Sequence, residues 1–443
     1  MKNILIIGAG RSASSLINYL LQHSASLDTT VTVGDISLAL AEQKTNKHPN
    51  GKAIAFDVNN SAQRENEITK AAVVVSMLPA SLHYLVAKDC LRLKKHLVTA
   101  SYVSKEIGLL DAEARAADIL FLNECGLDPG IDHMSAMKVI HEIQNDGGKI
   151  NSFKSYCGGL VAPEYNDNPW GYKFSWNPRN VILAGQGTAQ YIENNQYKYI
   201  PYNRLFTQTE KIVVDGIGEL EAYANRDSLS YREPYGLENI PTVLRGTLRM
   251  KGYCKAWNAF VQLGLTDDSY KIKDAEKLTY YDLLEAFLPN GNQSVKEKLA
   301  HFLGENKDSE VMQKLDWLGI FEKNKINLSD VSPAQILQDL LEKKWLLKPA
   351  DKDMILMQHE FEFVKNAKKE KIISSLMVKG EDQTYTAMAK TVGLPMAIAV
   401  KLILTGKLKR RGVAIPIYPE IYNPILEELA TLGIEFVEKK VSE

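Results

Sequence analysis

A glycine-rich turn close to the N-terminus constrains the fold of this chain more than any other feature. An apolar run at residues 3–8 (NILIIG) leads into Gly8-x-Gly10-x-x-Ala13, and leucines at helical spacing follow up to residue 22. In such a strand–turn–helix the first glycine permits the tight turn, the second lets the backbone approach a pyrophosphate, and the small third residue allows close packing. The helix N-terminus adds N–H donors. The sequence therefore predicts a dinucleotide-binding fold that begins at residue 3.

The first 130 residues repeat this alternation of apolar strand and amphipathic helix. Strand and helix at this rhythm are typical of a parallel, doubly wound sheet with helices on both faces. We therefore expect an α/β fold of the Rossmann type. Its further buried strands are predicted at residues 30–34, 53–58, 73–78, 97–103 and 119–122.

Beyond residue 130 the pattern of apolar and polar residues changes twice. A chain of 443 residues is too long for one hydrophobic core, so two or three domains are expected. Residues 354–364 and 372–379 read as paired strands, whereas 265–349 are helical in pattern almost throughout. The predicted organisation is a Rossmann domain at 1–130 that is rejoined by about 388–443, an α+β substrate and dimerisation domain at 131–264 and 350–387, and a helical subdomain at 265–349.

Composition and charge argue against nucleic-acid and membrane partners. The formal net charge is −1, and the basic run at 407–411 is typical of a solvated surface. We expect no cleavable leader and find no stretch of eighteen apolar residues. The helix predicted at 386–404 contains Pro395, where we expect a kink or a break. The four cysteines lack metal-ligand spacing, so we expect free thiols, no metal and a cytoplasmic location.

An acidic residue at the end of the second predicted strand concerns the choice of cofactor. Asp35 lies 27 positions after Gly8. A carboxylate there can accept hydrogen bonds from the ribose hydroxyls of NAD and would repel the 2′-phosphate of NADP. Arg11, one residue beyond the turn, could still pair with a phosphate. The pattern favours NAD and leaves NADP open.

Polar residues follow three neighbouring strands of the predicted sheet. Ser76 ends the fourth strand, Ser101-Tyr102 the fifth and Asn123-Glu124 the sixth. The carboxyl ends of parallel strands meet at the edge where a doubly wound sheet binds ligands. From their positions alone, these side chains could equally be ordinary polar loop residues that bind no ligand.

Several ordered motifs resemble the saccharopine dehydrogenase family, in its L-glutamate-forming branch that is also called saccharopine reductase. The similarity runs from residue 3 to about residue 428 and is weakest over 266–349. Two departures are Val161, where the family has proline, and Trp170, where it has an apolar residue such as leucine; both could reshape the rim of a pocket. The motifs are NECGLDPGIDHM (123–134), SYCGGLVAPE (155–164), NPWGYKFSW (168–176), NRDS (225–228) and LRGTLR (244–249), with SYVS (101–104) and AMAKTVGLP (387–395).

The resemblance implies a reaction. Saccharopine, NAD(P)+ and water would give L-glutamate, 2-aminoadipate 6-semialdehyde and NAD(P)H, or the reverse, through an imine that water hydrolyses. A substrate with three carboxylates favours arginine forks over lysine. Arg226 and Arg245 occupy motif positions that contact substrate in this family, whereas Arg249 is a weaker candidate that could be only a surface residue.

The resemblance also implies roles for other residues, each with a plainer alternative. Asp128 would hold an ammonium group, or only stabilise its turn. Cys157 would contact substrate and take part in proton transfer, or only pack. Tyr102 is the other candidate for the proton step, and His133 is interpreted as structural. The predicted catalytic residues are Tyr102, Asp128 and Cys157, with Ser101, Arg226, Arg245, Gly246 and Thr247 also binding substrate.

The expected cofactor contacts combine the turn with family positions, among which Phe174-Ser175 resembles a segment near the nicotinamide or a piece of core. Alternatives are a related imine-forming reductase, such as a carboxyspermidine-type dehydrogenase, or a non-catalytic dinucleotide-sensing protein. We expect a homodimer that acts on amino acids, and the sequence leaves the direction of flux open. The predicted cofactor contacts are Gly8, Gly10, Arg11, Ser12, Ala13, Asp35, Asp57, Val58, Ser76, Leu78, Val103, Leu127, Phe174 and Ser175.

Overall fold

The chain divides into two compact units. The computed structural model describes residues 1–441. The first unit comprises Met1–Ile150 and Phe363–Glu443, and the second comprises Asn151–Glu362. The chain passes from one unit to the other inside two strands, β7 (Lys149–Val161) and β13 (Asp353–Lys365).

A seven-stranded parallel sheet forms the centre of the first unit. Its order is β15-β6-β5-β4-β1-β2-β3, so consecutive strands run outward from β1 in both directions. The gap between β1 and β4 is the topological switch point at which such sheets bind ligands. The predicted parallel, doubly wound fold is confirmed. The strands are β1 (Lys2–Ile7), β2 (Thr29–Asp35), β3 (Gly51–Ala55), β4 (Ala71–Ser76), β5 (His96–Thr99), β6 (Leu120–Leu122) and β15 (Gly412–Ala414).

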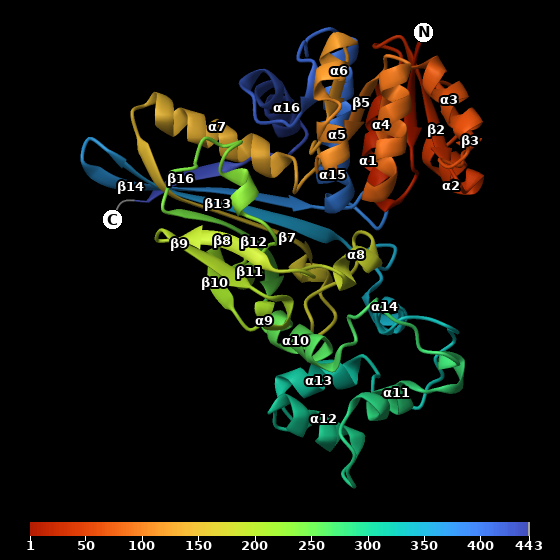
Figure 1. Ribbon diagram of the computed structural model, residues 1–443, viewed down its shortest axis with the longest axis vertical. Coiled ribbons are helices and arrows are strands. Elements are labelled where there is room, and N and C mark those ends of the chain that lie inside the picture. Colours follow the sequence, from red (N-terminus) through yellow and green to blue (C-terminus); the bar gives the residue numbers. More distant parts are fainter. Residues whose placement is uncertain (442–443) are drawn as a thin grey trace. The chain divides into compact units, whose positions relative to one another are not determined.

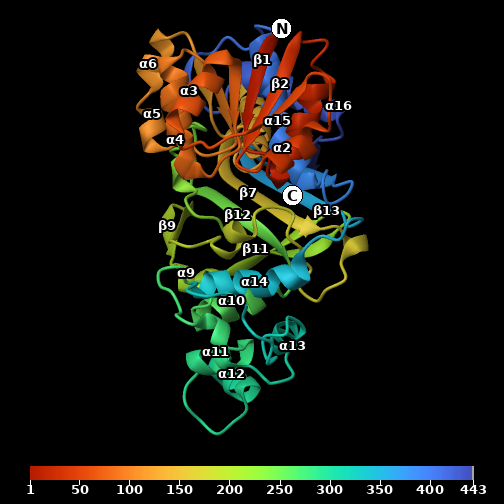
Figure 2. The ribbon, with the colours of Figure 1, turned by 90° about the vertical axis from the view of Figure 1, so that its right-hand side faces the viewer.

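Helices cover both faces of this sheet, as Figures 1 and 2 show. The helix predicted after the glycine-rich turn begins as a 3-10 turn at Arg11–Ala13 and continues as an α-helix from Ser14. The helices are α1 (Ser14–Gln22), α2 (Leu38–Thr45), α3 (Ser61–Lys70), α4 (His83–Arg92), α5 (Lys105–Gly108), α6 (Asp111–Ala116), α7 (Ile131–Asn145), α15 (Ala387–Leu404) and α16 (Pro419–Thr431).

The long helix α15 differs from its prediction. It continues through Pro395, so the break expected there does not occur. It packs against α1 so closely that a Cβ on Gly393 would lie 2.8 Å from the backbone N of Leu16. By length and composition α15 could cross a membrane, contrary to the expectation of no such segment, but 72% of it is buried within the structure.

A nine-stranded mixed sheet carries the strand order β10-β11-β12-β7-β13-β14-β16, and β8 pairs with β12 and β9. Strand β12 lies between antiparallel β11 and parallel β7. The remaining strands are β8 (Ala189–Glu193), β9 (Gln196–Ile200), β10 (Thr209–Val214), β11 (Gly218–Ala224), β12 (Thr242–Met250), β14 (Lys368–Lys379) and β16 (Val437–Val441).

The second unit also contains the helices of the predicted helical stretch. Three of them begin with a capping box, in which a serine or threonine and the residue three positions later satisfy each other's backbone N–H groups. The helices are α8 (Pro178–Ile182), α9 (Tyr202–Leu205), α10 (Tyr253–Leu263), α11 (Tyr280–Phe287), α12 (Val295–Leu303), α13 (Glu310–Trp317) and α14 (Pro333–Trp345).

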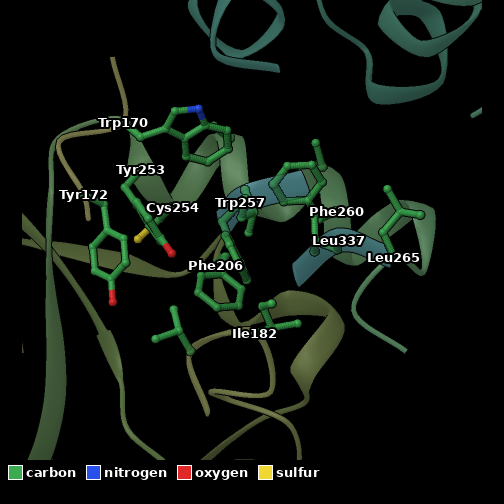
Figure 3. Close-up of a cluster of buried hydrophobic side chains, with 14 of the residues drawn as sticks. Trp170, Tyr172, Ile182, Phe206, Tyr253, Cys254, Trp257, Phe260, Leu265 and Leu337 are labelled. Atoms are coloured by element: carbon green, nitrogen blue, oxygen red, sulfur yellow. The ribbon is translucent and has the colours of Figure 1, made fainter. Parts of the chain in front are cut away.

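An aromatic cluster fills the core of the second unit. Trp170 is 1% exposed, stacks on Phe260 at 5.7 Å between ring centroids, and donates from Nε1 to the Lys314 carbonyl at 3.0 Å. Figure 3 shows Trp170 together with Tyr253, Trp257 and Phe260. The idea that Trp170 reshapes the rim of a pocket is therefore wrong, because its ring lies in this core. Val161, at 2% exposure, is buried too.

All four cysteines are free and buried. Cys90 and Cys125 lie in the first unit, and Cys157 and Cys254 in the second. Among residues 1–441, no group of three or more His, Cys, Asp or Glu side chains could hold a metal ion.

Candidate active site

The turn after β1 has the geometry that a pyrophosphate requires. Gly8 has φ +108°, and a Cβ there would lie 2.9 Å from the Met77 carbonyl oxygen, so only glycine fits. A Cβ on Gly10 would meet no heavy atom within 4 Å, which leaves open space beside the backbone. Ala13, in the third small position, is 1% exposed and packs under the turn. These residues fit a dinucleotide.

Asp35 is fixed against the same turn. Its Oδ2 accepts a hydrogen bond from the Ala9 N–H at 2.8 Å, and its Oδ1 accepts one from the Ser37 N–H at 2.9 Å. The carboxylate thus places a negative charge beside the turn and shapes it as well. Arg11 is exposed and Ser12 half-buried.

Two further predicted contacts, Asp57 and Val58, follow β3. Asp57 is exposed and accepts the Asn59 N–H at 2.9 Å through Oδ1, in a local turn. Val58 is buried, and its carbonyl accepts a hydrogen bond from the Arg64 guanidinium. Leu78, beyond β4, is half-buried. All three lie in the first unit with the glycine-rich turn.

A buried histidine connects the ends of β4 and β5. The Nδ1 of His83 lies 2.8 Å from Ser76 Oγ, and its Nε2 lies 2.7 Å from Ser101 Oγ. Burial lowers the pKa of His83 from 6.5 to about 4, so the ring is neutral at physiological pH. The structure thus brings together Ser76 and Ser101, which were predicted on separate strands. Sequence reasoning missed His83, although its position at the start of the helix after β4 was a usable signal.

Glu124 shapes the loop that carries Tyr102. Its backbone N–H donates to the Ser101 carbonyl, and its Oε1 accepts the Val103 N–H, both at 3.0 Å. Its Oε2 lies 2.7 Å from Nε2 of His133, which is 1% exposed in α7. Tyr102 itself is 42% exposed. The interpretation of His133 as structural agrees with this contact.

The next loop forms a tight turn around Asp128-Pro129, whose peptide bond is cis. A Cβ on Gly130, at φ +149°, would run into the Gly126 backbone. The Gly126 N–H donates to the Pro129 carbonyl at 3.0 Å. Leu127 is buried, and Asp128 is half-buried.

In the second unit, sheet register brings the predicted substrate residues into one row. Thr247 on β12 is paired with Cys157 on β7 and with Tyr223 on β11. Directly paired residues share one face of a sheet, and so do residues two apart on a strand. Arg245 and Arg249 therefore lie on the face of Thr247, whereas Gly246 faces the other side, where its Cα packs against the Tyr156 ring.

The two predicted arginines lie on adjacent segments. Arg245 is 3% exposed, with its guanidinium carbon 3.9 Å from the centre of the Tyr231 ring. Its carbonyl accepts the N–H of Asn225, which precedes Arg226, at 2.7 Å. Arg226 has φ +38° and is exposed. Within residues 1–441 its guanidinium makes no hydrogen bond or ion pair.

Arg249 is not the surface residue that the sequence allowed. It is 5% exposed, and its guanidinium lies 5.3 to 5.7 Å from the ring centres of Tyr172, Tyr223 and Tyr253. Its only hydrogen bond among the described residues is from NH1 to the Leu248 carbonyl at 2.8 Å. Burial raises the pKa of Tyr223, against the opposing effect of this cation. Alternation along β12 puts residue 249 on the same face of the sheet as residue 245, a signal that the sequence did contain.

Phe174 and Ser175 are both buried, at 0% and 3% exposure. Phe174 packs against Trp345 at 5.4 Å between ring centroids and donates its backbone N–H to the Trp345 carbonyl at 2.7 Å. These contacts agree with the alternative that this segment is core.

Comparison with known proteins identifies the family. The saccharopine dehydrogenase NADP binding domain matches residues 4–122, and the saccharopine dehydrogenase C-terminal domain matches residues 126–434. The nicotinamide-binding character of the first unit follows from the first match. Together the two domains cover most of the chain.

Relatives agree with these matches. Saccharopine dehydrogenase (NADP(+), L-glutamate-forming) of Schizosaccharomyces pombe is 33% identical over 453 residues, which cover 100% of both chains. The structure of apo saccharopine dehydrogenase (L-Glu forming) from Saccharomyces cerevisiae has a TM-score of 0.90, with 34% identity and 100% coverage of each chain. Alpha-aminoadipic semialdehyde synthase of Arabidopsis thaliana is 35% identical over 474 residues, and the chain spans 44% of its length. With two domain matches and full-length relatives, this chain belongs to the saccharopine dehydrogenase family.

Proposed function

We propose that this chain interconverts saccharopine with L-glutamate and 2-aminoadipate 6-semialdehyde, with a nicotinamide cofactor and water, in lysine metabolism. The observation that carries the proposal is the exposed side chain of Arg226, which follows the residue that is hydrogen-bonded to the Arg245 backbone, because a substrate with three carboxylates needs planar guanidinium groups to pair with them. Relatives that are named for this reaction and match over their full length support it.

The first unit would hold the cofactor through its backbone. Gly8 and Gly10 would let the chain approach the pyrophosphate, and the start of the 3-10 turn at 11–13 would face it. Ser76 and Val103 would line the nicotinamide end, at the carboxyl edge of the sheet. When bound, the cofactor accepts or supplies the hydride.

The substrate would be held by charge and by hydrogen bonds. We assign its carboxylates to Arg226 and Arg245, its ammonium group to Asp128, and hydrogen bonds to Ser101 and Thr247. Gly246, which was also predicted to bind substrate, has no side chain to offer it: the space that its missing Cβ leaves is filled by the Tyr156 ring on the opposite face of the sheet.

The proton step would fall to Cys157 or Tyr102. Loss of hydride beside the secondary amine gives an imine; water adds to its carbon, and the departing glutamate nitrogen takes a proton. Tyr102 is 42% exposed, in a loop whose Val103 N–H is bound by Glu124, whereas Cys157 is 8% exposed on β7. The pH–rate profiles of Tyr102→Phe and Cys157→Ser distinguish the two, because only loss of the group that shuttles the proton removes an ionisation from the profile.

The cofactor we propose is NAD, and the choice rests on Asp35. Its carboxylate lies beside the turn and would repel a 2′-phosphate. The matched domain and two relatives carry NADP in their names, and exposed Arg11 could pair with that phosphate. Steady-state rates with each cofactor decide the matter: a higher kcat/KM for NADP would contradict the NAD assignment.

The activity is tested by the appearance of reduced nicotinamide with saccharopine, and by its consumption with L-glutamate and the semialdehyde. Carboxyspermidine serves as the negative control. Absence of turnover with saccharopine in protein that binds the cofactor would overturn the proposal.

The arginine assignment has its own test. Arg226→Met and Arg245→Met should each raise the KM for saccharopine by about 10- to 100-fold, because each removes a charge-assisted hydrogen-bonding fork. Arg232→Met is the matched control, since Arg232 donates to the Tyr197 hydroxyl at 3.2 Å and should leave KM unchanged. Unchanged kinetics in the first two variants would remove these arginines from the site.

A further inference from the structure

His83 occupies an unusual place between two strand ends of the first unit. It is 2% exposed and begins α4, directly after a 3-10 turn at Ala80–Leu82. Its two ring nitrogens lie 2.8 Å from Ser76 Oγ and 2.7 Å from Ser101 Oγ. A third hydroxyl, Thr99 Oγ1, lies at 3.4 Å from Nε2 and accepts the Ser101 N–H at 3.3 Å. The imidazole is thus enclosed by hydroxyl groups from the ends of β4 and β5.

A neutral imidazole between two hydroxyls imposes a direction on both. One ring nitrogen donates and the other accepts. If Nδ1 carries the proton, it donates to Ser76, and Ser101 must give its own proton to Nε2. If Nε2 carries the proton, it donates to Ser101 Oγ, and the Ser101 O–H is free to donate to a ligand. The tautomer therefore decides whether Ser101 offers a ligand a donor or an acceptor.

We infer that His83 is a positioning residue that acts through Ser101: its Nε2–H tautomer holds the Ser101 hydroxyl as a hydrogen-bond donor to a substrate carboxylate. The inference rests on the proposed function, because saccharopine presents three carboxylates and so mostly acceptors. In this state Ser76 donates to Nδ1, so one hydrogen-bond chain through the His83 ring joins the hydroxyl at the end of β4 to the hydroxyl in the loop after β5.

A double-mutant cycle tests whether His83 acts through Ser101. His83→Leu and Ser101→Ala should each raise the KM for saccharopine by about tenfold with a smaller change in kcat, as expected for one lost hydrogen bond to a charged group. The double variant should be no worse than either single one. His83→Gln, whose amide can donate to Ser101, should recover most of the loss.

Three further measurements separate positioning from a general effect on folding. The matched control is His141→Leu, which also removes an imidazole–hydroxyl contact in the first unit (Nδ1 to Tyr422 OH, 2.8 Å) and should leave KM unchanged. Cofactor Kd and melting temperature are recorded for every variant. Nitrogen NMR of the wild-type complex with substrate should show the His83 proton on Nε2.

The outcomes are distinct. If the wild-type protein fails to oxidise saccharopine, the proposed function fails and this inference with it. If the wild-type protein is active, additive effects of His83→Leu and Ser101→Ala, or a proton on Nδ1 in the complex, overturn the inference and leave the proposed function intact.

Discussion

At the scale of single residues, His83 makes folding stability depend on pH. Its pKa is about 4 in the folded protein and 6.5 in the unfolded chain. Between these values the unfolded chain binds a proton that the folded protein does not, so the stabilisation present above the unfolded pKa is lost as pH falls towards 4. The loss is on the order of 3 kcal/mol.

His83→Gln should reduce this loss of folding stability at acid pH. Urea unfolding of the wild type and the variant, from neutral pH down to about pH 4, gives the difference directly. The difference in unfolding free energy between the wild type and the variant should become smaller as the pH falls. Parallel curves would mean that His83 carries no depressed pKa.

Arg249 allows a second test at this scale. A delocalised guanidinium among three tyrosine rings is stabilised by cation–π contacts, whereas an ammonium is a strongly hydrated point charge. We expect Arg249→Lys to lower the unfolding free energy by about 2 kcal/mol more than Arg249→Met, which removes the buried charge altogether. Denaturant midpoints measure this, and a more stable lysine variant would contradict the reasoning.

The residues of the site were only partly predictable. The pattern of apolar runs placed the strand ends near Ser76 and Ser101, because local sequence decides where such strands end. Burial did not follow from pattern, since it depends on segments distant in sequence: Arg249 is enclosed by Tyr172 and Tyr253. His83 escaped notice for the same reason, because its partners come from two other strand ends.

At the scale of elements, α15 controls the helix that follows the phosphate turn. A methyl group on Gly393 would lie 2.8 Å from the Leu16 backbone in α1, and backbone cannot give way as a flexible side chain can. We expect Gly393→Ala to lower the melting temperature and to weaken dinucleotide binding several-fold. Fluorescence titration with the cofactor measures the second effect.

The control for this variant is Gly108→Ala, where a Cβ would make an ordinary contact of 3.7 Å with Val103. It should keep both its melting temperature and its cofactor Kd. Equal losses in the two variants would show that the effect does not come from the contact between α15 and α1.

Strands were the most predictable elements, and α15 shows where prediction failed. β1 and β4 lie within two residues of their apolar runs because a strand covered on both faces leaves a continuous hydrophobic signature. A proline normally breaks a helix. In α15 most side chains are buried, including those around Pro395, and this packing keeps the helix continuous where intrinsic preference would end it.

At the scale of the whole molecule, the N-terminal segment of the first unit extends to Ile150. The change in the pattern of apolar and polar residues had suggested a boundary at 130, twenty residues earlier. The reason is α7, which contacts α16 within that unit. A contact between segments so far apart along the chain leaves no local signal.

The distribution of tryptophan tests how the two units unfold. All five tryptophans lie between residues 151 and 362, whereas the predicted dinucleotide site lies in the first unit. Because β7 and β13 each contribute residues to both units, we expect one cooperative transition. Saturating cofactor should therefore raise the midpoint seen by tryptophan fluorescence as much as that seen by circular dichroism. A shift in circular dichroism alone would show that the units unfold separately.

The hydrogen bonds of Asp35 limit how the cofactor specificity could be changed by mutation. The same carboxylate that would discriminate against a phosphate also anchors the Ala9 N–H inside the turn. Replacing Asp35 by a small neutral residue would remove the repulsion of the 2′-phosphate and also the hydrogen bond that orders the turn. The affinity for both dinucleotides would fall. A variant that accepts both cofactors and keeps its affinity would need a second substitution that supplies a new acceptor for the Ala9 N–H. Cofactor selectivity and cofactor affinity therefore depend here on the same side chain.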